Sequence, residues 1–63
     1  MSYTRKLKAE LAHNGWAFLR QGKGDHEIWY HPDFTNKIIV DNKIKSRHTA
    51  NAVLKQAGLP KAF

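Results

Sequence analysis

The 63-residue sequence has no cysteine and only two prolines. Without cysteine it can form neither a disulfide framework nor a thiolate metal site, so a chain this short depends on packing, or on a partner, for its stability. It also has no apolar run that approaches the ~20 residues of a membrane span. Because the N-terminal residues lack the apolar stretch of a secretory signal, we expect a cytoplasmic protein.

Acidic residues are scarce as well, since five Asp and Glu stand against eleven Lys and Arg, for a net charge of +6. This surplus of positive charge favours an anionic partner. No segment is amphipathic enough to favour a membrane surface. Nucleic acid or an acidic protein therefore remains as the expected partner.

Two segments carry apolar residues at helical spacing. The first covers residues 4–14 and ends at Asn14-Gly15, a common helix stop. The second begins after Ser46 or Thr49, either of which could be its N-cap, and ends at Gly58. The apolar positions are Leu7, Leu11 and Ala12 in the first helix and Ala50, Val53, Leu54 and Ala57 in the second.

Three short segments between the two helices have the composition of strands. They cover residues 16–20, 26–31 and 37–41, and they are joined by a turn at 21–24 and a loop at 33–36. The order is then α-β-β-β-α, and the short connections predict an antiparallel meander. We expect a single two-layer α+β domain over residues 1–63, with two helices on one face of a three-stranded antiparallel sheet.

The candidate catalytic residue is His26, which follows a glycine-rich basic turn and begins an aromatic strand. Gly22 and Gly24 let the backbone turn tightly and present its N–H groups to phosphate, while Lys23 adds positive charge. RNA cleavage needs little more, because the 2′-hydroxyl of the substrate is the nucleophile. His26 would act as general base or acid, and Lys23 or Lys37 would neutralise the phosphorane.

Two further groups of residues could contact RNA. Trp29 or Tyr30 would stack on an unpaired base. Which face of this strand is buried stays open, because Ile28 and Tyr30 compete with Trp29 for the core. The basic run before the second helix, which includes Lys45 and Arg47, could hold phosphate at the helix N-terminus.

The same residues also have an interpretation without function. A lone histidine beside a turn is usually a half-exposed polar residue, and spacing alone favours this for His26. The basic run before the second helix is as compatible with a solvated face as with phosphate binding. The aromatic and aliphatic residues of the first two strands are usually core, which here means Trp16, Phe18, Ile28 and Trp29.

A metal site is a less favoured interpretation, and we expect neither a metal nor a cofactor. No two of the four histidines lie four apart on a helix, and His26 and His31 fall on opposite faces of a strand because their separation is odd. Asp25 and Glu27 share a face and could hold Mg²⁺ through phosphates, but such carboxylates more often form a solvated edge. The hydroxyl residues lack the context of an activated nucleophile and are better explained as cap or tail residues; they are Ser2, Ser46 and Thr49.

The order of several motifs along the chain is more specific than any of them alone. The motifs are Asn14-Gly15-Trp16, Arg20-Gln21, Gly24 to Trp29, His31-Pro32 and Ala52 to Leu59. Together they resemble the HicA toxins, also called the YcfA-like family, over nearly the whole chain. The most specific parts are the glycine-x-histidine step at Gly24 to His26 and the Leu-Lys-Gln-Ala-Gly stop of the second helix.

This resemblance implies a fold like that of double-stranded-RNA-binding domains. It also implies the toxin of a type II toxin–antitoxin system, an endoribonuclease that cleaves mRNA without a metal and carries its catalytic histidine at His26. A HicB-type antitoxin protein would silence it.

Asp25 departs from the family pattern, in which serine or threonine usually precedes the histidine. A carboxylate there favours protonated His26, which helps an acid role and hinders a base role at neutral pH. The alternatives are therefore an inactivated toxin, a non-catalytic RNA-binding domain, or a domain that binds an acidic protein.

Overall fold

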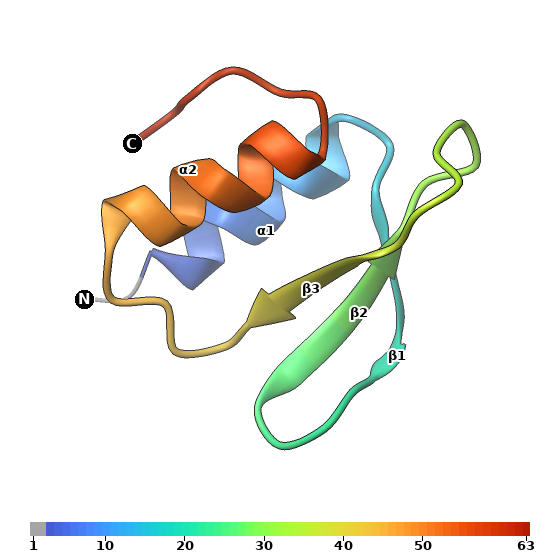
Figure 1. Ribbon diagram of the computed structural model, residues 1–63, viewed down its shortest axis with the longest axis horizontal. Coiled ribbons are helices and arrows are strands. Elements are labelled where there is room, and N and C mark those ends of the chain that lie inside the picture. Colours follow the sequence, from blue (N-terminus) through green and yellow to red (C-terminus); the bar gives the residue numbers. More distant parts are fainter. Residues whose placement is uncertain (1–2) are drawn as a thin grey trace.

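The computed structural model describes residues 3–63 and confirms the α-β-β-β-α order. Ser2, expected to be a cap or tail residue, lies outside the described residues. The helices are α1 (Thr4–His13) and α2 (Arg47–Gln56), and the strands are β1 (Ala17–Gln21), β2 (His26–Tyr30) and β3 (Ile38–Asp41). The strands form one antiparallel sheet in the order β1-β2-β3, with both helices on one face of it (Figure 1). Neither helix in residues 3–63 has the length and apolar character of a membrane span.

The ends of α2 follow from local sequence. The side chain of Ser46 accepts a hydrogen bond from the His48 N–H at 3.2 Å, so the first of the two expected N-caps is confirmed. At the other end Gly58 has a φ of +73°, which favours glycine. The Leu59 N–H then donates to the Leu54 carbonyl at 2.9 Å, which forms a Schellman motif and confirms the expected helix end at Gly58.

The register of the sheet decides which face of β2 is buried. Trp29 lies opposite Ile38, and both are buried against the helices. Because Trp29 is only 7% exposed, its ring belongs to the core and presents no face to a base, which corrects the expectation that it stacks on RNA. Side chains alternate along a strand, so Ile28 and Tyr30 lie on the opposite, outer face of the sheet.

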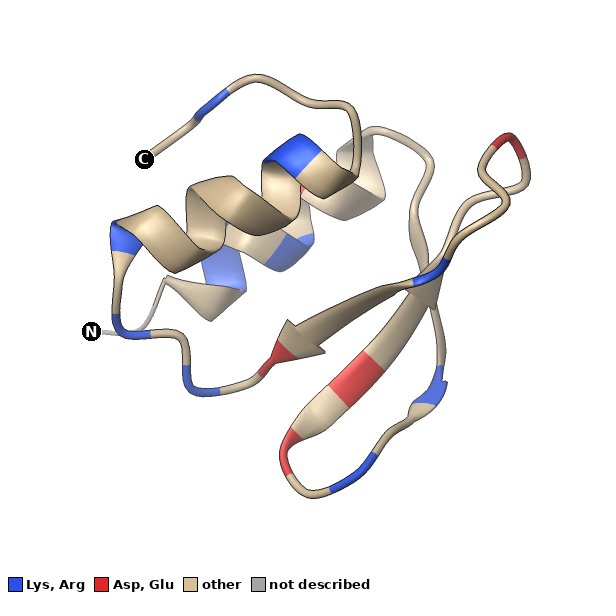
Figure 2. Cartoon of the chain, viewed as in Figure 1, with Lys and Arg blue, Asp and Glu red and all other residues tan. Residues whose placement is uncertain are grey.

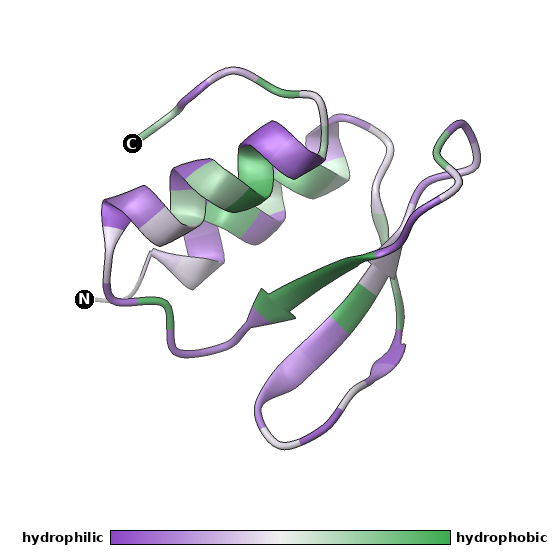
Figure 3. Ribbon diagram, in the orientation of Figure 1, coloured by the Kyte–Doolittle hydropathy of each residue, from purple (hydrophilic) through white to green (hydrophobic). Residues whose placement is uncertain are grey.

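The helices and the inner face of the sheet enclose one hydrophobic core (Figure 3). Its fully buried members include Leu7, Leu11 and Leu54, and truncation of one of them to alanine should cost about 2–5 kcal/mol of stability. Phe18, expected in the core, is instead 50% exposed, because β1 is an edge strand and lies away from the helices. Within residues 3–63 the core cluster comprises Leu7, Leu11, Trp16, Trp29, Ile38, Val40, Ile44, Ala50, Val53, Leu54 and Ala57.

His31 joins the end of α1 to the loop that follows β2. Its Nδ1 accepts the Asp33 N–H at 3.0 Å, so its Nε2–H is left to donate to the Asn14 carbonyl at 3.1 Å. Its ring also packs edge-on to Trp16, with ring centroids 5.4 Å apart. The ring leaves no room beside Gly15, where a Cβ would lie 2.7 Å from Nε2, and the φ of +92° there also favours glycine.

Candidate active site

The β1–β2 turn fixes the backbone of His26 from several sides. The His26 carbonyl accepts the Gly22 N–H at 2.7 Å and the Gln21 side-chain amide at 2.9 Å. The same amide donates to the Gly24 carbonyl at 3.0 Å, and Gly24 itself has a φ of +62° that a larger residue rarely adopts. The His26 N–H closes the turn onto the Lys23 carbonyl at 3.2 Å. These hydrogen bonds therefore hold the backbone of His26 in a defined position at the start of β2.

The side chain of His26 lies on the outer face of the sheet, because its neighbour Glu27 points inward to α1. It is 49% exposed. Asp41 lies directly opposite on β3, and its Oδ2 is 3.8 Å from His26 Nε2. This separation is within ion-pair range but too long for a direct hydrogen bond. One ring nitrogen thus faces a carboxylate, while the side chain remains open to solvent.

The segment after β3 is anchored against α1, which holds Asp41 in place. The Thr4 hydroxyl donates to the Asp41 carbonyl at 3.0 Å and accepts the Ile44 N–H at 3.1 Å. Ile44 is buried at 3% exposure, and the Asp41 carboxylate also accepts the Lys43 N–H at 2.7 Å. Sequence reasoning missed Asp41 as a neighbour of His26, because that pairing depends on the strand register.

Asp25 does not turn its carboxylate towards the catalytic candidate. Its Oδ2 pairs with Lys43 Nζ at 3.1 Å, and its backbone carbonyl accepts both the main-chain and side-chain N–H groups of Asn42, at 3.0 and 2.8 Å. These contacts join the β1–β2 turn to the segment that follows β3. The carboxylate of Asp25 is therefore paired with Lys43, and Asp41 is the carboxylate that faces the imidazole.

Glu27 is held under the sheet rather than beside Asp25. Its carboxylate pairs with Lys8 of α1 at 2.9 Å and accepts the Trp29 indole N–H at 3.0 Å, and Lys8 also donates to Asn42. Partial burial raises the pKa of Glu27, but the hydrogen bonds and the charge of Lys8 outweigh this, so the pKa lies below its ordinary value. The two carboxylates thus do not form the Mg²⁺ pair considered from the sequence. Within residues 3–63 no cluster of three or more metal-ligating side chains is present.

The expected RNA-contacting cations divide between two ends of the molecule. Lys23 lies in the turn before His26, and the connection that carries Lys45 leads from the end of β3 to Arg47 at the start of α2, beside the same end of the sheet (Figure 2). Lys37 precedes β3 at the other end, four residues from Asp41, or roughly 13 Å along the strand. Lys37 therefore cannot neutralise charge at the phosphate that His26 would contact.

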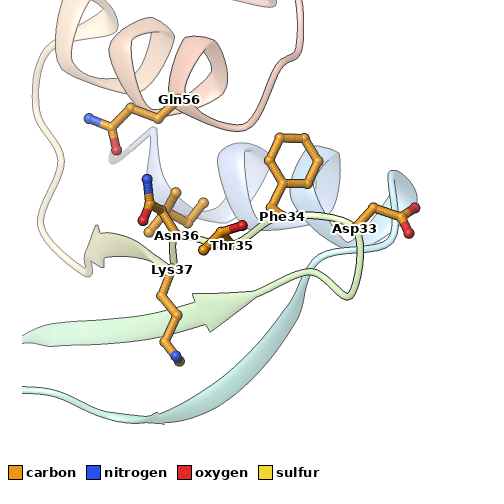
Figure 4. A pocket seen from close by; sticks show the side chains of 7 residues that line it. Asp33, Phe34, Thr35, Asn36, Lys37 and Gln56 are labelled. Carbon is orange, nitrogen blue, oxygen red and sulfur yellow. The ribbon is translucent and has the colours of Figure 1, made fainter.

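A pocket of about 580 Å³ lies at the Lys37 end, between the β2–β3 loop and α2. Phe34, Asn36 and Gln56 are among the residues that line it (Figure 4). The Lys37 side chain leads away from α2 in the same view. Because His26 is on the outer face at the opposite end of β2, this pocket is separate from the candidate active site.

The chain also matches a known protein family. The model described as the HicA toxin of bacterial toxin-antitoxin matches residues 4–59, which covers both helices and all three strands. No curated protein and no solved structure matches the chain.

Proposed function

The chain belongs to the HicA toxin family of bacterial toxin–antitoxin systems, and from this premise we propose that it is a metal-independent endoribonuclease that cleaves mRNA through His26. The observation that carries the proposal is the placement of a half-exposed histidine beside a basic turn, at the end of the sheet where α2 begins. Lys23, Lys45 and Arg47 would contact the RNA backbone on either side of this histidine.

The reaction would use the 2′-hydroxyl of the substrate as nucleophile. His26 takes the proton of this hydroxyl while its oxygen attacks the adjacent phosphorus, and the P–O5′ bond breaks to leave a 2′,3′-cyclic phosphate. The leaving 5′-oxygen takes up a proton from the imidazolium or from water. A positioned general base contributes about 10²–10⁴-fold to such a step. Lys23, with the backbone N–H groups of its turn, would stabilise the charge on the phosphorane.

Asp41 has a supporting part in this proposal. With its carboxylate 3.8 Å from Nε2, it favours one orientation of the imidazole and stabilises the positive charge that His26 acquires during the reaction. Nδ1 would then be the nitrogen that exchanges the proton with RNA. Asp41 acts through His26, so it is a positioning residue.

The antitoxin partner would be a HicB-type protein that covers the same end of the sheet. Because the toxin surface is basic and its histidine is half exposed, an acidic segment of the partner would exclude RNA by occupying the cations around His26. Charge reversal at Lys23 should therefore weaken binding of both RNA and antitoxin.

The decisive experiment incubates the purified protein and folded His26→Ala with one RNA, and with the DNA of the same sequence, in the presence of EDTA. We expect the unchanged protein to cut RNA only, and His26→Ala to lose at least 10²-fold in rate with an unchanged melting temperature. Cleavage by folded His26→Ala would remove His26 from the mechanism.

A second outcome would identify the alternative function. Asp41 faces His26 at 3.8 Å, and Asp25, which directly precedes His26, stands where the family usually has serine or threonine. RNA that is bound but not cut by the unchanged protein would indicate a non-catalytic RNA-binding domain or an inactivated toxin. Asp25→Ser, which restores the usual family residue, would separate these two by recovering cleavage only in the second case.

A further inference from the structure

The outer face of the sheet is left uncovered by the fold. Both helices pack against the inner face, which Trp29 and Ile38 line. The alternation along β2 and β3 therefore directs Ile28, Tyr30 and Ile39 outward, on the same face as His26. Ile39 is 56% exposed and Tyr30 is 41% exposed. A solvated sheet face is ordinarily polar, so this apolar surface beside the candidate active site calls for a ligand.

The charges around this surface fit an anionic ligand. Arg20 of β1 pairs with Ile28 of β2, which places Arg20 on the outer face. Lys37 directly precedes Ile38, the first residue of β3, and so lies at the end of the sheet away from His26. Figure 4 shows the Lys37 side chain leading away from the helices. Cations thus border the apolar surface at its edge and at the end away from His26.

No carboxylate interrupts the outer face between His26 and Tyr30 in the described part of the chain. Asp41 lies beside His26 itself, and Asp25 lies in the preceding turn. Glu27 points inward, Asp33 follows β2 in the loop, and Glu10 belongs to α1. The carboxylates of an acidic protein could pair with the cations at the border of the apolar surface, but they would have no partner on the apolar surface itself. A nucleic acid fits both parts, because its bases can pack on the apolar surface while its phosphates pair with the cations.

We propose that the outer sheet face is a subsite for single-stranded RNA, along which bases pack on Tyr30 and Ile39 while a phosphate reaches His26. The five residues from His26 to Tyr30 are four steps along the strand and span roughly 13 Å, enough for about three or four stacked bases at ~3.4 Å each. Duplex RNA is recognised through phosphates and 2′-hydroxyls, and its bases are not free to lie on an aromatic ring. The subsite therefore selects unpaired RNA, and it deepens the proposed ribonuclease function on which it rests.

The test measures RNA binding in the His26→Ala background, so that the RNA stays intact. The probes are a fluorescent oligouridylate of about twelve nucleotides and an RNA duplex of similar length. We expect Tyr30→Ala to weaken oligouridylate binding about 5- to 100-fold with little effect on the duplex, and Tyr30→Phe to keep most of the affinity. Phe18→Ala is the matched control, since Phe18 is an aromatic residue of similar exposure, 50% against 41%, on the inner side of the same sheet.

A second pair of variants keeps the test independent of the tyrosine. Ile39→Glu should weaken oligouridylate binding more than Ile39→Lys, because both remove the same apolar side chain and only glutamate also repels the phosphates. Unchanged oligouridylate affinity in folded Tyr30→Ala and Ile39→Glu would overturn the subsite, as would equal losses for oligouridylate and duplex. If the unchanged protein cuts no RNA yet binding depends on Tyr30, the catalytic proposal fails and the subsite stands.

Discussion

His26 and His31 lie five residues apart, at and just beyond the two ends of β2. The side chain of His26 is 49% exposed, and its Nε2 faces Asp41 at 3.8 Å. The side chain of His31 is 13% exposed, and both of its ring nitrogens have backbone hydrogen-bond partners. The ring nitrogens of His31 are therefore occupied by hydrogen bonds that stabilise the fold, whereas the ring of His26 has no such bonds to the backbone and is accessible for proton transfer. The difference comes from the surroundings, because the residue type is the same.

Of the two histidines, His31 is the one whose replacement should cost more stability. His31→Ala removes two hydrogen bonds, each with a net value of about 0.5–1.5 kcal/mol, and the ring contact with Trp16. We expect the free energy of unfolding to fall by about 2–3 kcal/mol, measured by urea denaturation. His26→Ala should change it by less than about 0.5 kcal/mol, as is usual for an exposed position. Equal losses of stability in the two variants would contradict the view that His31 stabilises the fold and His26 does not.

Glu27 allows the inner and outer faces of the sheet to be compared at neighbouring positions, because it directly follows His26 but points to the inner face. Its pKa is lowered in the folded protein, so its contribution to stability is full above the ordinary carboxyl pKa and is lost as pH falls through the lowered value. Glu27→Gln should cost about 1–2 kcal/mol near neutral pH, because its hydrogen-bonded ion pair with Lys8 is lost.

The measurement compares urea unfolding of Glu27→Gln and the unchanged protein between about pH 3 and 7. The difference in free energy should shrink as pH falls. A difference that stays constant with pH would show that the charge of Glu27 is not what stabilises the inner face.

The smallest expected effect is the change in rate when the carboxylate of Asp41 beside His26 is removed. Asp41 and His26 are both about half exposed, and an exposed ion pair contributes only about 0.2–1 kcal/mol, so Asp41→Asn should lower kcat/KM about 2- to 5-fold.

Asp33→Asn is the matched control for Asp41→Asn, since Asp33 lies 4.0 Å from His31 and is 86% exposed. This variant should leave kcat/KM unchanged. A loss of rate in both variants, or in neither, would remove Asp41 from its positioning role.

Much of the fold was predictable because its signals are local. The helical spacing of Leu7 and Leu11, the cap at Ser46 and the stop at Gly58 each depend on residues within one or two turns of helix. Strand boundaries differed by one residue, as at Trp16, which lies in the core just before β1. Local geometry also accounts for the turn that presents His26.

The assembly of the candidate site was less predictable, because it depends on pairings across the sheet. The roles expected for Trp29 and Lys37 assumed that both lie near His26 on an accessible surface. The register instead buries Trp29 and leaves Lys37 four residues away along β3. No short-range signal contains this information, since a shift of one residue would exchange the two faces of a strand.

By itself the sequence determined the element order, the helix ends, the surplus of positive charge and the position of His26 after a glycine-rich turn, all of which depend on composition or on neighbours along the chain. Only the tertiary structure decided that Asp41 faces His26, that Lys43 neutralises Asp25, and that an apolar sheet face stays open beside them. Those features arise where strands and loops distant in sequence pack together, because contacts between them depend on register and on which face the helices cover.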